Sequence, residues 1–323
     1  MGWYLARQRL AKREKFPLIV ELEPLFQCNL ACSGCGKIQH PEHELRRRMP
    51  VAQAVAAIEE SGAPMVSIAG GEPLIHPEID AIATELVKRK RFVYLCTNAL
   101  LLERKLDKFK PSPYFAWAVH VDGLRERHDA SVEREGTFDK AVAAIKAAQA
   151  AGFRVTTNTT FFTHDSAKTV REVLDFLNDD LRVDEMMISP AYAYEKAPDQ
   201  DHFLGVQQTR SLFSAAFADG RRKRWRLNHS PLFLDFLEGK AEFECTAWGI
   251  PSYSLFGWQR PCYLMADGYA TTYRELIETT DWSSCGRGRD PRCENCMAHC
   301  GYEPTAVLQT TRSLRQSLRA LIS

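Results

Sequence analysis

Short apolar runs alternate with amphipathic segments along the first two thirds of the chain. Runs typical of buried strands lie near 18–23, 65–69, 92–96, 114–121, 154–161 and 185–189. Helical patterns lie between them, near 51–61, 77–90, 100–108, 137–151 and 168–178. Strands that alternate with helices of this length indicate βαβ units and a parallel sheet. The pattern therefore predicts an α/β fold with a partial, TIM-like (β/α)6 barrel.

The pattern changes beyond residue 200, where an aromatic- and cysteine-rich stretch follows. We expect three parts: an N-terminal helix over 1–16, a core barrel over 17–205 and a small C-terminal domain over 206–323. At 323 residues and 45% hydrophobic content, the chain can bury a large core. Its formal net charge of +1 gives no basis for bulk affinity for nucleic acid.

The sequence contains no apolar run near the roughly 20 residues that span a bilayer, and its N-terminus lacks a secretory signal core. We therefore expect a cytoplasmic protein, in which ten cysteines favour metal and redox chemistry over disulfides. The run 3–13 mixes aromatic, apolar and basic residues at roughly helical spacing. It is either a peripheral helix on the inner face of the cell membrane or a solvated terminal helix. The basic run 221–226 is likewise either a contact for anionic lipid or a solvated helix end.

Three cysteines lie within eight residues after the first predicted strand, namely Cys28, Cys32 and Cys35. Cysteine is the usual ligand for each iron of a four-iron cluster, so a loop that supplies three leaves one iron open. Their spacing alone leaves a structural zinc site equally open.

A second motif, Gly70-Gly71-Glu72-Pro73, follows the second predicted strand. Two glycines at a strand end let the backbone approach a ligand closely, and Glu72 can accept a hydrogen bond from an ammonium group. A structural zinc site requires no such partner, so this motif favours an iron–sulfur site.

With both motifs in this order, the chain resembles the radical S-adenosylmethionine (SAM) superfamily. The resemblance implies a [4Fe–4S] cluster on Cys28, Cys32 and Cys35, whose fourth iron is chelated by the amino and carboxylate groups of SAM. It also implies that the segment 70–72 helps to hold the methionyl ammonium, and that one-electron transfer cleaves SAM to methionine and a 5′-deoxyadenosyl radical. One departure is Gly34, at a position that is commonly aromatic and packs on the adenine. Contact with the adenine must therefore come from elsewhere.

Further polar residues follow the later strands, and chemistry in such barrels collects at the carboxyl ends of the strands. We expect Asn158 and Ser189 to contact SAM, and His120 and Asp122 to form the pocket wall. For any one of these residues, ordinary hydrogen bonding at a strand end is the more common explanation, and it is the group of them together that points to a ligand site. Cys96, at the end of the third strand, is by default a small buried hydrophobe. However, the weak S–H bond of a thiol also suits delivery of a hydrogen atom to a substrate radical.

A second group of cysteines lies in the C-terminal part. The ligand set that we predict is Cys245, Cys262, Cys293 and Cys296, with Cys285 and Cys300 as alternates. Two single cysteines and a Cys-x-x-Cys pair are compatible with zinc or with a second iron–sulfur cluster. The spacing selects neither metal and does not place this group relative to the first.

Several runs resemble the adenosylhopene transferases, a radical SAM family of hopanoid biosynthesis. They are 22–26, 32–39, 94–101, 196–200 and 256–263, and the similarity covers almost the whole chain. It implies that the 5′-deoxyadenosyl radical adds to the terminal alkene of diploptene, a C30 hopene, and that the resulting radical is reduced to adenosylhopane. This reaction calls for a terminal hydrogen donor, such as Cys96, and for a one-electron reductant such as flavodoxin or ferredoxin. SAM is consumed as a co-substrate.

Two other functions remain open. A radical SAM maturase that modifies a peptide would also carry additional C-terminal cysteines. The aromatic-rich segment 248–263 fits an apolar lipid pocket better, although aromatic residues also form ordinary core. An iron–sulfur electron carrier or sensor would not cleave SAM, and the motif at 70–73 argues against it.

Overall fold

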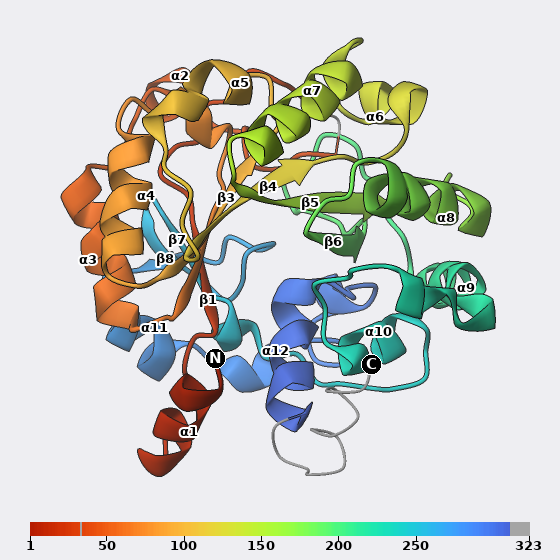
Figure 1. The fold of residues 1–323 in the computed structure, drawn as a ribbon. Coiled ribbons are helices and arrows are strands. Elements are labelled where there is room, and N and C mark those ends of the chain that lie inside the picture. The colour runs from red at the N-terminus through yellow and green to blue at the C-terminus, as the bar shows by residue number, and fades with distance from the viewer. Residues whose placement is uncertain (33, 311–323) are drawn as a thin grey trace.

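The computed structural model describes residues 1–32 and 34–310 of the chain, and its strands form one sheet (Figure 1). The order across the sheet is β6-β5-β4-β3-β2-β1-β7-β8-β9. The strands are β1 (Ile19–Leu22), β2 (Met65–Ile68), β3 (Phe92–Thr97), β4 (Phe115–His120), β5 (Arg154–Phe161), β6 (Glu185–Pro190), β7 (Ser252–Ser254), β8 (Gly257–Gln259) and β9 (Tyr269–Ala270). Strands β1 to β6 pair in parallel, which confirms the predicted partial barrel.

Helices surround the outer side of this sheet in Figure 1. Those between the parallel strands are α2 (Glu42–Leu45), α3 (Val51–Ser61), α4 (Ile79–Lys88), α5 (Leu102–Lys105), α6 (Arg125–Ser131), α7 (Thr137–Ala150) and α8 (Ala167–Asp175). The remaining helices are α1 (Gly2–Leu10), α9 (Val206–Ala216), α10 (Pro231–Leu237), α11 (Tyr273–Thr279) and α12 (His299–Thr310). The helix predicted near 100–108 is divided, because α5 continues only as a single 3-10 turn over Leu106–Lys108.

Strand β3 illustrates how one sequence supplies both a core and a site. Val93 and Leu95 are fully buried between the sheet and the helices. Tyr94 and Cys96 alternate with them and line a cavity inside the barrel. Successive side chains of a strand point to opposite faces, so alternate positions of the same run serve packing and chemistry.

Part of the predicted C-terminal domain belongs to the barrel sheet. Strand β7 runs parallel to β1, with Glu21 opposite Ser252 and Leu22 opposite Tyr253, and β8 and β9 follow antiparallel. Strands of two or three residues are too short to produce a readable alternation, so the sequence pattern did not indicate them. The segment 252–270 therefore completes the sheet and carries Cys262 in the loop between β8 and β9.

Helix α1 covers part of the segment 1–16 in which a terminal helix was predicted, and it is attached to the body on one side. Leu5 is buried in a small cluster with Phe16 and Leu18. On its other side, Trp3 is 77% exposed and Leu10 is 85% exposed. Among the described residues, no helix has the length and apolar content needed to cross a membrane.

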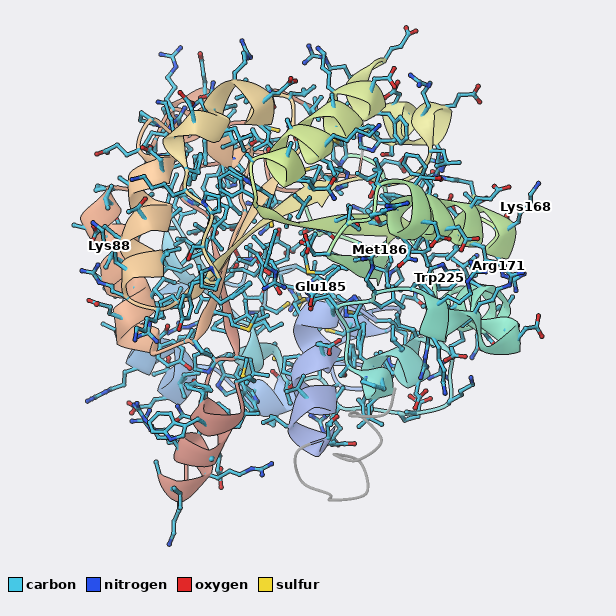
Figure 2. All side chains as sticks on the ribbon, viewed as in Figure 1. Lys88, Lys168, Arg171, Glu185, Met186 and Trp225 are labelled. Atoms are coloured by element: carbon cyan, nitrogen blue, oxygen red, sulfur yellow. The ribbon has the colours of Figure 1, made fainter. Side chains whose placement is uncertain are left out.

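The basic run at 221–226 is tied to acidic groups of its own chain. Arg222 forms ion pairs with Asp235 at 2.8 Å and with Glu238 at 2.6 Å. Trp225, labelled in Figure 2, donates its indole N–H to Asp175 at 2.8 Å. These contacts favour an internally anchored segment over a lipid contact.

Candidate functional site

The inner face of the parallel strands encloses a cavity of about 590 Å³. Its lining includes the three cysteines of the first loop and Cys96. It also includes Ile19 and Met65, the first residues of β1 and β2, so the cavity extends along the length of the barrel. Its size is within the range of small-molecule sites.

The cysteine loop lies at the carboxyl end of β1, as the sequence predicted. Cys28, Cys32 and Cys35 all line the cavity, and the amide of Leu30 donates to the Cys28 sulfur at 3.4 Å. Burial raises the pKa of Cys28 to about 11 and that of Cys32 to about 12. Thiolates at these positions therefore need a bound cation, which an iron–sulfur cluster supplies.

Among the described residues, no three His, Cys, Asp or Glu side chains are arranged to share a single metal ion. A [4Fe–4S] cluster makes a different demand, because each thiolate binds its own iron. Cys28, Cys32 and Cys35 border one cavity, so their thiols can each bind a different iron of the same cluster.

Gly70 and Gly71 are required by the cysteine loop itself. Gly70 has a φ of +105°, and a Cβ there would lie 2.3 Å from the carbonyl oxygen of Leu25. A Cβ on Gly71 would lie 2.1 Å from the carbonyl oxygen of Gln27. The amide of Gly71 also donates to the Leu25 carbonyl at 3.0 Å. Gly70 and Gly71 thus let the end of β2 contact the backbone that leads into the cysteine loop. The sequence pattern by itself predicts only a ligand contact for these two glycines.

Glu72 is 1% exposed, and its carboxylate joins the ends of β2 and β3. It accepts hydrogen bonds from the Thr97 hydroxyl and the Asn98 amide, both at 2.8 Å, and from the Leu74 amide at 3.0 Å. Burial raises the pKa of this carboxyl, and these hydrogen bonds oppose the rise. A carboxylate offers about four acceptor positions, so about one remains for a ligand ammonium.

His120 and Asp122 form an ion pair in the cavity wall. The distance from His120 Nε2 to Asp122 Oδ2 is 2.9 Å, and the other Asp122 oxygen accepts from the Thr160 amide at 2.8 Å. Burial disfavours the charged forms, but mutual attraction outweighs it, so the pKa of His120 is raised and that of Asp122 is lowered. Asn158, opposite His120 on β5, also lines the cavity.

Ser189 does not lie where the sequence predicted it. Its hydroxyl donates to the carbonyl of Pro190 at 3.1 Å, and among the described residues that line the cavity it is absent. The Ser189 hydroxyl bonds to the backbone of its own strand, whereas Met187 of the same strand lines the cavity.

Two aromatic rings lie near Gly34, the position at which the superfamily commonly has an aromatic residue that packs on the adenine. A Cβ on Gly34 would lie 3.6 Å from the Phe162 ring and 3.9 Å from the Phe203 ring. Both rings line the cavity, and the Phe162 ring stacks on His164 with centroids 5.7 Å apart. The sequence pattern indicated neither residue, because only the folded chain brings them to the cysteine loop.

Cys96 lies inside the cavity wall, 3.5 Å from the hydroxyl oxygen of Ser67. Burial raises the pKa of its thiol to about 12, so the thiol keeps its hydrogen at neutral pH. The cysteine loop and this thiol therefore face one common space.

All six C-terminal cysteines line a second cavity of about 370 Å³. These residues are Cys245, Cys262, Cys285, Cys293, Cys296 and Cys300. Burial and the neighbouring thiols raise the pKa of Cys245 well above its usual value. The fold therefore gathers the four predicted ligands and both alternates at one place.

The two cysteine-lined cavities are neighbours. Tyr192, Tyr194 and Cys300 line both of them. The spacing of the cysteines in the sequence did not determine this arrangement, which depends on how α12 and the segment after β6 meet.

Comparisons with known proteins agree with this geometry. Residues 22–177 match the Radical SAM superfamily, and residues 186–320 match a Domain of unknown function (DUF3463). GTP 3′,8-cyclase 1 of Mycobacterium tuberculosis is 29% identical over 182 residues, covering 52% of this chain and 51% of that protein. Fe-coproporphyrin III synthase of Methanosarcina barkeri is 26% identical over 147 residues, or 44% of this chain and 36% of that protein. The chain thus spans about half or less of the length of these curated relatives.

Solved structures share the fold. Streptococcus suis SuiB bound to precursor peptide SuiA superposes with a TM-score of 0.68 at 16% identity, over 96% of this chain and 76% of that chain. The anSMEcpe structure with bound AdoMet and Cp18Cys peptide gives a TM-score of 0.61 at 18% identity, over 89% of each chain.

The barrel, the cysteine loop and the matched segment define a radical SAM domain. Residues 22–177, which include Cys28, Cys32 and Cys35, match the radical SAM superfamily, and members of that superfamily bind a [4Fe–4S] cluster and SAM.

Proposed function

We propose that this chain is a radical SAM enzyme that transfers the adenosyl group of SAM to the terminal alkene of diploptene, giving adenosylhopane. When bound, the cluster and SAM supply a 5′-deoxyadenosyl radical at the expense of one electron from a flavodoxin or ferredoxin. The residues of the chain hold the two reactants in one cavity, exclude water and deliver the last hydrogen atom.

The position of Cys96 is the observation that carries this proposal. Addition of a carbon radical to an alkene leaves a new carbon radical, which needs one hydrogen atom to become a stable product. Cys96 is the thiol on the inner face of β3, in the cavity that the cysteine loop also lines. Transfer of its hydrogen atom forms a C–H bond and leaves a sulfur radical on Cys96.

The cavity wall supports binding of both reactants. Near the cysteine loop, the free acceptor position of Glu72 suits the methionyl ammonium and the Phe162 ring suits the adenine. Towards the other end the lining turns apolar, with Ile19, Met65 and Met187. A hydrocarbon fits that end, because burial of apolar surface is its main source of affinity.

A further cavity that adjoins the barrel cavity supports entry from a lipid surface. A smaller cavity, of about 320 Å³, is lined by Met1, Met65 and Tyr94, and the last two also line the barrel cavity. The Tyr94 hydroxyl accepts from Asn228 at 3.0 Å, and Asn228 also donates to Glu185, the first residue of β6, which is labelled in Figure 2. This cavity includes Met1, directly before α1, the helix that exposes Trp3 and Leu10. Peripheral attachment through α1 is therefore part of the proposal.

We assign the second cavity a metal site on Cys245, Cys262, Cys293 and Cys296. Cysteine donors suit zinc or a second iron–sulfur cluster by residue type. The arrangement favours a cluster, because no three such side chains of the described residues are placed to share one ion, whereas in a cluster each thiolate binds its own iron. Its wall in common with the barrel cavity supports a role close to the reaction.

The product mass tests the proposed function. Anaerobically reconstituted protein is incubated with SAM, dithionite and diploptene. A product equal to hopene plus adenosyl plus one hydrogen, with release of methionine, is expected. Release of methionine and 5′-deoxyadenosine without any hopene adduct would reject the lipid substrate.

Peptide maturation is the second candidate. It is supported by the fold shared with SuiB and anSMEcpe and by the additional cysteine-lined cavity. Incubation of the same preparation with cell peptides, followed by a search for mass changes in them, separates the two functions.

A further inference from the structure

Three polar side chains form a chain across the inner face of β1, β2 and β3. Glu21 on β1 is directly opposite Ser67 on β2, on the same face of the sheet, and Ser67 is close enough to lower the pKa of the Glu21 carboxyl. The Ser67 hydroxyl oxygen lies 3.5 Å from the sulfur of Cys96 on β3. The pleat places all three on the cavity side, and all three line the cavity. The Ser67 hydroxyl therefore lies between the Glu21 carboxyl and the Cys96 thiol on this face.

Glu21 is buried, and the cation that acts on it, Lys37, forms its ion pair with Glu23 instead. Lys37 pairs with Glu23 at 3.0 Å, and its ammonium lies 3.6 Å from the centroid of the Tyr263 ring. The other titratable groups that face Glu21 are Cys96 and, from the far wall, Tyr192, Tyr263 and Cys300. Burial raises the pKa of Glu21 to about 7, so its carboxyl holds a proton during much of the time at neutral pH.

The proposed function leaves Cys96 without its hydrogen after every turnover. We propose that Glu21 and Ser67 are a proton relay that restores the Cys96 thiol for the next turnover. The carboxyl of Glu21 is the proton source, and the hydroxyl of Ser67 is the bridge.

Restoration of the thiol requires one electron and one proton. The product radical takes a hydrogen atom from Cys96, which forms a C–H bond and leaves a sulfur radical. One electron from the flavodoxin or ferredoxin class of reductant converts this radical to a thiolate. Ser67 gives its hydroxyl proton to the thiolate and receives the proton of Glu21, and the Glu21 carboxylate is reprotonated from water. Burial raises the pKa of Cys96 to about 12, so its thiolate takes a proton readily from a carboxyl.

This relay rests on the proposed function, and the number of turnovers separates the two. The first turnover uses the hydrogen already on Cys96, so it does not need the relay. Later turnovers do. A change of Glu21→Gln keeps the shape of the side chain but removes the acidic proton.

The experiment compares the first turnover with later ones under excess SAM, dithionite and diploptene. For Glu21→Gln and for Ser67→Ala, one adduct per chain is expected at the wild-type rate. Later turnovers are expected to slow by about 10²-fold, which is the lower end of what a positioned proton donor contributes. Glu21→Asp, which keeps the acid, should restore part of the later rate. Ser252→Ala is the matched control, because Ser252 is opposite Glu21 on the other neighbouring strand.

Three results would overturn the relay while leaving the proposed function intact. In the first, both variants keep the wild-type rate in all turnovers. In the second, they lose the first turnover as severely as the later ones. In the third, Ser252→Ala gives the same loss of later turnovers as Ser67→Ala. Absence of the hopene adduct with wild-type protein would instead overturn the proposed function, and the relay with it.

Discussion

Replacement of Gly70 by alanine tests whether the end of β2 holds the cysteine loop in place. Two costs combine at this position. The φ of +105° lies in the left-handed region, where a side chain costs about 1–2 kcal/mol. The new Cβ would lie 2.3 Å from the Leu25 carbonyl oxygen, and overpacking against backbone costs about 1–3 kcal/mol. We therefore expect the free energy of unfolding to fall by about 2–5 kcal/mol.

Gly62→Ala is the matched control for this change. Gly62 has a φ of +70°, but no heavy atom lies within 4 Å of the point that a Cβ would occupy. It should lose only the backbone cost of about 1–2 kcal/mol. Anaerobic urea unfolding measures both losses, and iron content per chain should fall for Gly70→Ala alone. If both variants lose the same free energy of unfolding and keep their iron content, the contact of Gly70 with the cysteine loop neither stabilises the fold nor helps to hold the cluster.

Four further changes test other parts of the site. Phe162→Ala should raise the dissociation constant of SAM by a factor of roughly 2 to 13, as calorimetry would measure, because one aromatic contact contributes about 0.5–1.5 kcal/mol. Asp122→Asn should remove the stabilisation of the folded state by the His120–Asp122 ion pair. That stabilisation is complete between pH 3.8 and 6.5, where both partners are charged. That stabilisation fades above this window as His120 loses its proton and below it as Asp122 gains one, so the difference in unfolding free energy should peak there. Cys96→Ala should leave SAM cleavage intact but change the yield or stereochemistry of the adduct; an unaltered product rejects this role. Deletion of 1–13 should abolish binding to vesicles that contain anionic lipid; unchanged partitioning would contradict the membrane role of α1.

The elements of the barrel could be predicted because their signals are local. The run Met65–Ile68 and the helix pattern of Val51–Ser61 each contain their own period, and each forms where it was expected. The cysteine loop is equally local, since three ligands within eight residues need no distant partner to be recognised.

Polar side chains at strand ends were predicted less well. Asn158 and Ser189 are both small polar residues on the last strands, yet only Asn158 lines the cavity. The Ser189 hydroxyl bonds to the backbone of its own strand whereas the Ser67 hydroxyl lies in the cavity wall, and a sequence pattern does not distinguish these outcomes. Phe162 is a comparable case, because a single aromatic residue after a strand is more often ordinary core.

The sequence by itself determined the order of strands and helices, the loop of Cys28, Cys32 and Cys35, and the glycine pair that follows β2. These features depend on neighbours in the chain, so a linear pattern contains them. Only the tertiary structure decided that β7 joins β1, that the two cysteine-lined cavities share a wall, and that Glu21 reaches Cys96 through Ser67. Those relations depend on strand register and on contacts between residues far apart in the chain, which the order of residues alone does not reveal.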